Sequence, residues 1–380
     1  MTYDLFIFAG EASGDLHGEK LLQELYALNP TLRIKGVGGP RMRAVGMECL
    51  FEMEEFETMG FIDVLFAIPK LYKKFHILKE DILNNQPKGV VTIDYPAFNL
   101  RMANALLREG SCSKRIHYIC PKVWAWGKQR IPKMERSLDH LLTIFPFETP
   151  LFSKERLKTT YVGHPLIARI ENHLYDPNWH KEYGIEREST IISIFPGSRE
   201  KEVLRNLPIQ MKVAEALQET DPSLVIALSC AQQKLRPLFK VKENVRMIES
   251  KHSYELMRAS HLALATSGTI TLELALHHIP TIVTYALHPI DLFIAQHLLR
   301  IRLTHFSLPN IIYNGEVFPE LVGPLLKEQT LLNKAEEFML SECLRSQCIE
   351  KCKKLKDFLG KKNASQEAAQ IILSSLNEAP

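Results

Sequence analysis

Acidic side chains follow two strand-like runs in the first part of the chain, where they could act on protons. Glu11 and Asp15 lie in the segment FAGEASGD, and Asp94 ends the run GVVTID. A buried carboxylate at a strand end is costly unless it is bonded or used, and Pro96 restricts how the chain leaves that strand. A positioned carboxylate can take a proton from an attacking hydroxyl. We therefore predict Asp94 as a general base, with Glu11 as the second choice, while Asp15 could equally cap a helix.

The segment PGSREKEV predicts an anion-binding turn in the second half of the chain. It places Gly197, Ser198 and Arg199 at the start of an amphipathic helix. Backbone N–H groups, the helix dipole and the guanidinium would all favour a phosphate there. An ordinary N-cap serine followed by glutamates is equally compatible with this segment taken alone.

A second turn of the same kind follows the apolar run LALAT. It contains Ser267, Gly268 and Thr269, and Glu273 lies one helical turn further on. Small residues let an anion approach a helix N-terminus closely, and a carboxylate can accept hydrogen bonds from both ribose hydroxyls. Two such turns and an acid together predict a site for a diphosphate-linked nucleoside.

These side chains need elements to position them. Strand-like runs alternate with segments long enough for helices, which is typical of parallel sheets with helical crossovers. We therefore expect two doubly wound α/β domains that bind ligands at the carboxyl ends of their strands. The expected boundaries are 1–170 for the first domain and 171–345 for the second, followed by a helical tail over 346–380. The runs are YDLFIF, GVVTID, RIHYIC, HLLTIF and TTYVG, then TIISIF, LVIALS, VRMIE, HLALAT and TIVTYA.

The composition narrows the class of protein. Lys+Arg 47 nearly balance Asp+Glu 44, so the net charge of +3 argues against a dedicated nucleic-acid binder. The seven cysteines include no C-x-x-C pair, which predicts reduced thiols and no metal site. No apolar run approaches the roughly 18 residues of a spanning helix. Met1 leads directly into a strand-like run, which leaves no room for a signal peptide, so we expect a cytoplasmic protein.

An ordered set of short motifs links these features. The segments are FAGEASGD, GVGGPRMRAVG, MGFIDVL, TIDYPAFN, CPKVWAWGKQRI, FPFE, VGHP, FPGSR, SGTITLE and SLPN. Their order and approximate spacing resemble those of the lipid-A-disaccharide synthase family. The resemblance runs from about Leu5 to Asn310, with a weaker helical tail beyond. PGSR or SGT alone would be a weak signal, whereas the whole set with its W-A-W segment is specific.

The resemblance implies an inverting glycosyltransferase of the GT-B type, with two Rossmann-like doubly wound domains facing a cleft and C-terminal helices. Such an enzyme would transfer 2,3-diacylglucosamine from UDP-2,3-diacylglucosamine to the 6-hydroxyl of 2,3-diacylglucosamine 1-phosphate, forming a β-1,6 disaccharide and UDP. It implies no cofactor and no metal, because Arg199, helix N-termini and the 267–269 turn would neutralise the leaving diphosphate. Asn310, in FSLPN, would bond a donor phosphate or sugar hydroxyl, unless it belongs to a simple Pro-initiated turn.

The first domain would then bind the acceptor. Ser13 and Asp15 lie in the first turn, where they would contact sugar hydroxyls. Arg41, in GVGGPRMRAVG, would bind the acceptor's 1-phosphate together with backbone donors, although a solvated surface charge is equally compatible. Trp124 and Trp126 suit a sugar or an acyl chain, and core packing explains them at least as well.

The apolar and basic stretch MGFIDVLFAIPKLYKKFHILK has the composition of an interfacial membrane anchor. A buried helix with a solvated basic face is the alternative. Because both implied substrates carry acyl chains, we expect peripheral association with the cytoplasmic face of the inner membrane. The resemblance also implies that C-terminal elements could form a homodimer. The candidate membrane contacts are Phe66, Ile68, Lys70, Leu71, Lys73 and Lys74.

The chain departs from the family's pattern at Ala97, Cys120, Lys122 and Ala168. These changes leave the predicted base and the cationic turn in place, so they concern acceptor preference or rate more than reaction class. Two other functions stay open. A UDP-sugar 2-epimerase of the same architecture would need neither an acceptor nor an anchor, and a non-catalytic nucleotide-sugar-binding relative would bind without turnover.

Overall fold

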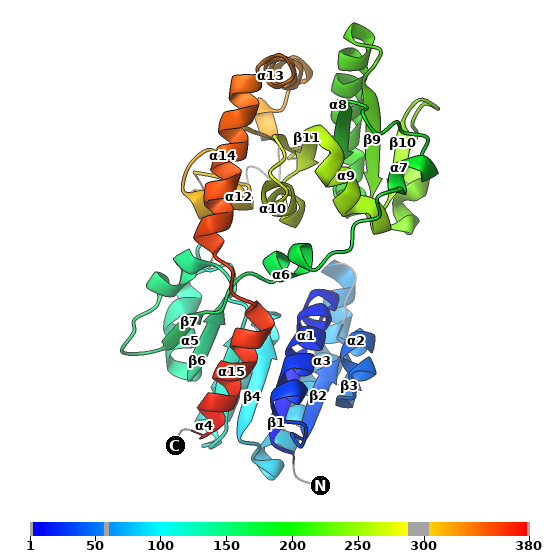
Figure 1. The fold of residues 1–380 in the computed structure, drawn as a ribbon. Helices are drawn as coiled ribbons and strands as arrows, with labels where there is room; N and C mark the ends of the chain where they lie inside the picture. Colours follow the sequence, from blue (N-terminus) through cyan, green and yellow to red (C-terminus); the bar gives the residue numbers. More distant parts are fainter. Residues whose placement is uncertain (1–2, 57–60, 126, 288–303, 378–380) are drawn as a thin grey trace. The chain divides into compact units, whose positions relative to one another are not determined.

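The computed structural model describes residues 3–56, 61–125, 127–287 and 304–377, with the backbone alone described over 61–68. The chain divides into two compact units, Met1–Ala168 with Lys361–Pro380, and Arg169–Gly360. Each unit contains one parallel β-sheet covered by helices (Figure 1). The chain therefore passes between the units twice, near residue 168 and again near residue 360.

The described part of the first unit contains seven parallel strands in the order β3-β2-β1-β4-β5-β6-β7. The central strands β1 and β4 are buried along their whole length, as apolar runs are in a sheet covered on both faces. The strand order reverses between β1 and β4, and ligands bind at the carboxyl ends of strands at such a switch point. The strands are β1 (Leu5–Ala9), β2 (Ile34–Gly38), β3 (Glu48–Glu52), β4 (Gly89–Ile93), β5 (Lys114–Tyr118), β6 (His140–Thr143) and β7 (Lys158–Tyr161).

Helices connect these strands and cover the first sheet. The helix α4 packs against α3 and α5, while α1 packs against α2 and the C-terminal helix α15. An aromatic core forms where Phe8 of β1 stacks on Phe98 of α4, with Phe56 edge-on to both. These helices are α1 (Ala12–Leu28), α2 (Pro40–Ala44), α3 (Phe61–Asn85), α4 (Pro96–Arg108), α5 (Ile131–Ser137) and α15 (Ala364–Asn377). The boundary between the two units falls within α6 (Pro165–Glu171).

The described part of the second unit contains six parallel strands in the order β10-β9-β8-β11-β12-β13. Its switch point lies between β8 and β11, which are fully or almost fully buried. The strands are β8 (Ile191–Phe195), β9 (Val225–Cys230), β10 (Arg246–Glu249), β11 (Ser260–Thr266), β12 (Thr281–Tyr285) and β13 (Glu320–Val322). The helices are α7 (Trp179–Glu182), α8 (Glu200–Thr220), α9 (Ser253–Ala259), α10 (Thr269–Leu276), α12 (Leu308–Tyr313), α13 (Glu328–Leu340) and α14 (Glu342–Leu359).

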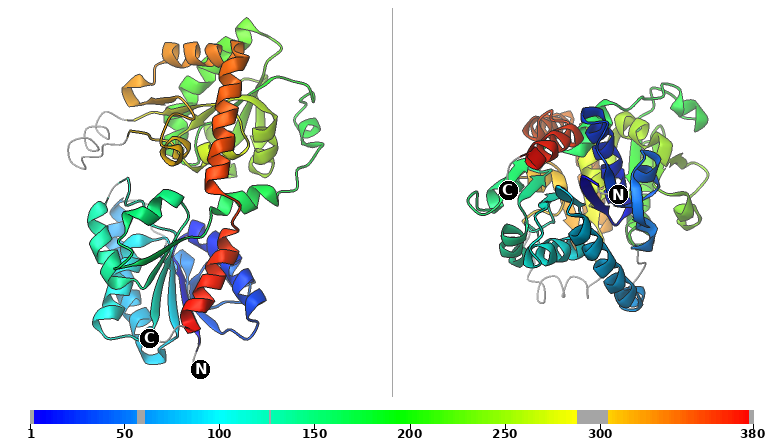
Figure 2. Two further views of the ribbon diagram at one scale, coloured as in Figure 1. Left: turned by 60° about the vertical axis from the view of Figure 1, so that its left-hand side comes forward. Right: turned by 90° about the horizontal axis from the view of Figure 1, so that it is seen from below.

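The last two helices belong to different units. Helix α14 packs on α10, α12 and α13, whereas α15 packs on α1 and β5 of the first unit (Figure 2). Gly360, with a φ of 65°, ends α14 in a backbone conformation that favours glycine. The alternation of strands and helices thus predicted the fold class correctly, since both units are Rossmann-like parallel sheets.

Candidate active site

The switch point of the first sheet brings Glu11 and Asp94 together. Ala9 of β1 and Ile93 of β4 are paired in register, so the residues that follow them leave the sheet side by side. The Asp94 carboxyl shares a hydrogen bond with Glu11. Burial, and then the negative charge of Glu11, raise the pKa of Asp94 to about 6. A carboxyl with a pKa near the operating pH can accept a proton efficiently, which is what a general base needs.

The backbone at this turn is strained. Asp94 and Tyr95 have φ values of 46° and 47°, a left-handed conformation that costs roughly 1–2 kcal/mol for a residue with a Cβ. The side-chain amide of Asn99 donates to the Asp94 carbonyl over 2.7 Å, and the Tyr95 hydroxyl donates to the Phe56 carbonyl over 3.2 Å. Pro96 then opens α4. These contacts hold the turn and fix where the Asp94 carboxyl lies, as is common at functional sites.

Asp15 has a defined structural task. Its carboxylate accepts hydrogen bonds from the backbone N–H groups of Gly39, Arg41 and Met42, at 2.8, 3.1 and 3.0 Å. The residue is 3% exposed, and a Cβ at position 39 would lie 2.5 Å from its carboxylate. Asp15 therefore caps the N-terminus of α2, a helix that is distant in the sequence. The sequence analysis considered it only as a cap of the helix that follows the first strand.

Two other predicted acceptor residues also have partners within the chain. Ser13 donates to the Glu11 carboxylate over 2.9 Å, so it orients the partner of Asp94. The Arg41 guanidinium forms an ion pair with Glu19 at 3.2 Å. Neighbouring Arg43 is similarly paired with Glu54, at 2.9 Å. The cations of this segment are thus already balanced by carboxylates.

Trp124 contacts Glu148, a buried acid that was not among the residues predicted from the sequence. Its indole N–H donates to Glu148 over 3.2 Å, and the backbone N–H of Phe145 donates to the same carboxyl over 3.2 Å. Glu148 is 1% exposed, and burial raises its pKa to about 8. The available signal was an acid inside the apolar segment FPFE, which follows β6. Trp126 lies outside the described residues.

The carboxyl ends of β8 and β11 carry the two predicted anion turns. Phe195 of β8 pairs with Ala265 of β11, so the turns leave neighbouring strands of the second sheet. Gly197 has a φ of 117°, and a Cβ there would lie 2.7 Å from the Glu202 side chain. The sequence therefore needs glycine at this position, both for its conformation and for the close approach.

Glu202 already occupies the N-terminus of α8. Its carboxylate accepts from the backbone N–H groups of Ser198 and Arg199 at 3.1 and 3.3 Å. The Arg199 guanidinium, whose side chain is 82% exposed, donates to the same carboxylate over 2.9 Å. The chain thus places its own anion on the donors predicted for a phosphate, which shows that these donors can converge on one negative group.

The second turn is more open. Gly268 and Thr269 are exposed at the start of α10, and among the described residues no atom beyond the adjoining ones lies within 4 Å of a Cβ built on Gly268. Ser267 donates to the Phe306 carbonyl over 3.1 Å. One turn further, Glu273 accepts a hydrogen bond from the Tyr254 hydroxyl over 2.9 Å, and burial raises the pKa of its carboxyl. Tyr254 thus holds this acid in place.

The Asn310 side chain forms its hydrogen bonds within the protein. It is 1% exposed, its carbonyl oxygen accepts from the N–H groups of Val317 and Phe318, and its amide donates to the Phe318 carbonyl. The same segment is held by Glu320, which accepts from both N–H and hydroxyl of Ser307 at 2.7 and 2.6 Å. A direct bond from Asn310 to the donor stays a prediction, and its observed contacts position the 306–318 segment.

The proposed membrane segment lies on α3, where the side chains of Phe66 and Ile68 lie outside the described residues. Leu71 packs on the aromatic core of the first unit. Lys74 forms an ion pair with Glu55 at 2.7 Å, while Lys70 and Lys73 are exposed. In the described part of the chain, no helix combines the length and apolar character needed to cross a bilayer, and no cluster of three potential metal ligands occurs there.

The two Rossmann-like units match solved structures of the GT-B type in fold. A solved UDP-GlcNAc 2-epimerase from Neisseria meningitidis, bound to UDP-GlcNAc, matches with a TM-score of 0.65 and 12% identity, covering 97% of this chain and 99% of that one. The glycotransferase of kitacinnamycin matches with a TM-score of 0.61 and 11% identity, covering 98% of each chain. At these identities the likeness establishes the GT-B type of fold alone.

The sequence identifies the family. The model of the lipid-A-disaccharide synthetase family matches residues 5–374, and the chain belongs to this family. A lipid-A-disaccharide synthase from Chlamydia felis is 42% identical over 326 residues, which is 85% of this chain and 52% of that protein. One from Geobacter metallireducens is 31% identical over 378 residues, covering 98% and 97%. The chain thus spans about half the length of the Chlamydia relative, and the resemblance inferred from the motifs is confirmed.

Proposed function

We propose that the protein is an inverting glycosyltransferase that condenses UDP-2,3-diacylglucosamine with 2,3-diacylglucosamine 1-phosphate. The products are UDP and a β-1,6-linked disaccharide 1-phosphate. The observation that supports this most strongly is the bonded pair of Glu11 and Asp94 at a switch point, with the pKa of Asp94 raised to about 6. Membership of the family and the GT-B type of fold support the same reaction.

The chemistry assigned to Asp94 is proton removal. The acceptor's 6-oxygen attacks the anomeric carbon of the donor, the bond from that carbon to the diphosphate oxygen breaks, and the hydroxyl proton passes to Asp94. Attack opposite the leaving group inverts the configuration at the anomeric carbon. Glu11 acts through Asp94, because its negative charge increases the affinity of the neighbouring carboxyl for a proton.

The second unit would hold the donor. The N-termini of α8 and α10 and the Arg199 guanidinium would stabilise the negative charge that grows on the departing diphosphate. Glu202 would have to yield the N–H groups of residues 198 and 199 to this ligand, since it binds them in its absence. Glu273 would accept hydrogen bonds from the ribose hydroxyls while Tyr254 holds it.

The assay of this proposal uses the full chain in detergent micelles with both lipid substrates. We expect stoichiometric release of UDP and a disaccharide 1-phosphate detected by mass spectrometry. Structural neighbours include UDP-GlcNAc 2-epimerases, so a second incubation omits the acceptor. Conversion of the UDP-sugar to an epimer in that incubation would identify an epimerase. Donor binding without any product in either incubation would identify a non-catalytic relative.

The acylated substrates also lead us to propose peripheral binding to the cytoplasmic face of the inner membrane, and the family resemblance of the C-terminal elements leads us to propose a homodimer. Exposed Lys70 and Lys73 on α3 would contact anionic headgroups, each contributing about 1 kcal/mol. The test is co-sedimentation with phosphatidylglycerol vesicles, in which changing both lysines to Glu should weaken binding. The matched control is Lys154→Glu, a change of an exposed lysine elsewhere in the first unit. Sedimentation velocity tests the dimer.

A further inference from the structure

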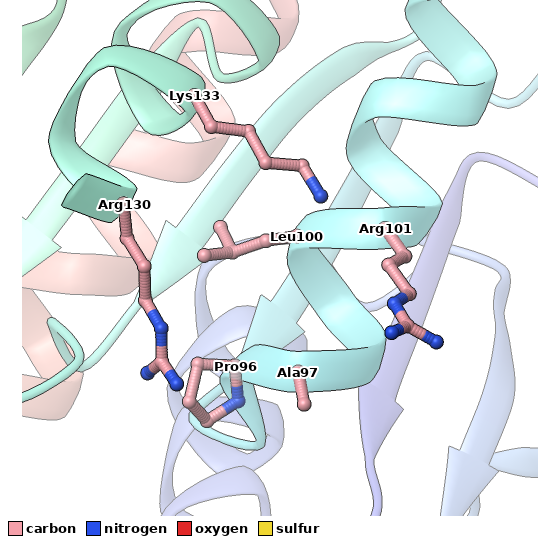
Figure 3. A pocket seen from close by; sticks show the side chains of 6 residues that line it. All are labelled: Pro96, Ala97, Leu100, Arg101, Arg130 and Lys133. Atoms are coloured by element: carbon pink, nitrogen blue, oxygen red, sulfur yellow. The ribbon is translucent and has the colours of Figure 1, made fainter. Parts of the chain in front are cut away.

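A small basic cavity lies between α4 and α5 in the first unit, outside the residues assigned above. Its volume is about 210 Å³. Leu100 and Ala97 form an apolar wall on α4, and Pro96 begins that helix at the mouth. Figure 3 shows Arg130 extending toward Pro96, Lys133 reaching from α5 toward α4, and Arg101 beside Ala97. Three cationic side chains from two segments thus surround one cavity.

The positive charge of this cavity is not balanced within the described residues. No described carboxylate forms an ion pair with Arg101, Arg130 or Lys133, whereas Arg41 and Arg43 of the same unit both have acidic partners. Burial, and then the positive charges of Arg101 and Arg108, lower the pKa of the Lys133 ammonium. The cluster therefore lacks an anion that would relieve its mutual repulsion.

The helix adds to this positive field. Pro96 and Ala97 are the first residues of α4, a helix of 13 residues, and both line the cavity, so the positive end of the helix dipole lies beside it. Two guanidinium groups offer planar, forked donors that match phosphate oxygens, and the ammonium adds a compact charge. This set fits a dianionic phosphate monoester better than a single carboxylate.

We propose that this cavity binds a phosphate monoester and that, on the function proposed above, the ligand is the 1-phosphate of the acceptor sugar. The cavity begins two residues after Asp94, so a phosphate held there keeps the same sugar close to the proposed base. The assignment moves the phosphate site from Arg41, whose charge Glu19 already balances, to the 97–133 region. Arg101 and Lys133 would act as binding residues and take no part in proton transfer.

The test compares wild type with the double variant Arg101→Gln/Lys133→Gln. Arg136→Ala is the matched control, because Arg136 is an exposed cation on α5 that does not line the cavity. The single variant Lys133→Arg retains the positive charge and should bind the ligand as wild type does. Phosphorus NMR titration with glucosamine 1-phosphate measures the site directly, and initial rates give separate KM values for donor and acceptor. Thermal unfolding checks that each variant is folded. If the double variant does not fold, the single variant Arg101→Gln replaces it in the test, because Arg101 is exposed.

We expect the double variant to bind glucosamine 1-phosphate at least tenfold more weakly and to show a similar rise in acceptor KM, with donor KM and kcat unchanged. Loss of probe binding in a protein that shows no transfer would support the phosphate site and reject the transferase. Unchanged probe binding and acceptor KM in an active double variant would overturn the site and leave the transferase standing. Loss of binding to phosphatidylglycerol vesicles, with acceptor KM unchanged, would assign the cavity to a lipid phosphodiester and also overturn the proposal.

Discussion

The carboxyl groups of Asp94 and Glu11 share a hydrogen bond although 83 positions separate them in the chain, because their strands β4 and β1 are paired. The pair has a direct kinetic consequence. Asp94 must be ionised to accept a proton, so kcat/KM should fall as the pH drops below about 6. Asp94→Asn should lower turnover by about 10²–10⁴-fold and leave UDP affinity nearly unchanged.

Glu11→Gln is the control for this prediction. Removing the Glu11 charge should shift the acidic limb of the pH profile to lower pH, because that charge helps to raise the pKa of Asp94. If Glu11→Gln abolishes turnover and Asp94→Asn retains most of it, the two roles are reversed. A loss of only a few-fold in both variants would mean that neither carboxylate is the base.

The same shift predicts an effect on stability. The folded-state pKa of Asp94, about 6, lies above its ordinary value of 3.8, so the folded protein binds this proton more tightly than the unfolded chain. The associated stabilisation is present below pH 3.8 and is lost as the pH rises through 6. Asp94→Asn should therefore gain roughly 1–3 kcal/mol relative to wild type between pH 4 and pH 7.

Urea unfolding across that pH range measures the difference. Asn tolerates the left-handed backbone at position 94 better than Asp does, which would add a constant offset that does not depend on pH. The pH-dependent part of the difference is therefore the quantity to compare. A constant difference between the two proteins would show that the carboxyl is not destabilised by its surroundings.

Arg199→Ala should weaken UDP binding by roughly 1.5–3 kcal/mol, the range for a hydrogen bond to a charged group. The side chain is 82% exposed at the N-terminus of α8, and its guanidinium would exchange the Glu202 carboxylate for the ligand. The matched control is Lys201→Ala, which removes an exposed cation in the first turn of the same helix. Calorimetric titration measures the UDP affinity of each variant. Equal affinity in wild type and Arg199→Ala would show that Arg199 does not bind the donor.

Glu202→Gln should bind UDP several-fold more tightly than wild type. The Glu202 carboxylate competes for the N–H groups of residues 198 and 199 and for the Arg199 guanidinium, and an uncharged amide would compete less well. The variant should also lose about 1 kcal/mol of stability, because the helix loses part of its N-terminal cap. Weaker UDP binding would instead mean that Glu202 positions the turn for the ligand.

The sequence predicted the candidate site best where a strand end determines the position of a side chain. Asp94, Gly197 and Ser267 lie within two residues of the ends of buried apolar strands, and parallel strands bring their carboxyl ends to one edge. The strands that went unnoticed have weaker patterns. Strand β3 is half-exposed at the sheet edge, and β2 contains Gly36, where a Cβ would lie 1.8 Å from the Ile7 carbonyl oxygen.

Contacts between distant segments could not be read from local patterns. Asp15 binds the N-terminus of α2, 24 to 27 residues further along the chain, and no spacing rule links those positions. The basic cavity likewise combines Arg101 with Lys133 from separate helices. Arg41 and Arg43 have acidic partners whereas Arg101 and Lys133 form no ion pair with a described carboxylate, a difference that the sequence alone does not show.

The return of α15 to the first unit determines when that unit can finish folding. Helix α15 packs along α1 and β5, Ser375 contacts His140 of β6, and a Cβ on Gly89 would lie 2.6 Å from the Leu376 side chain. This part of the N-terminal core is therefore completed by residues that the ribosome adds more than two hundred positions after β7. During synthesis the surface of the first unit that α15 covers stays exposed until the second unit has been made. A nascent chain halted before residue 361 would expose this apolar surface to chaperones.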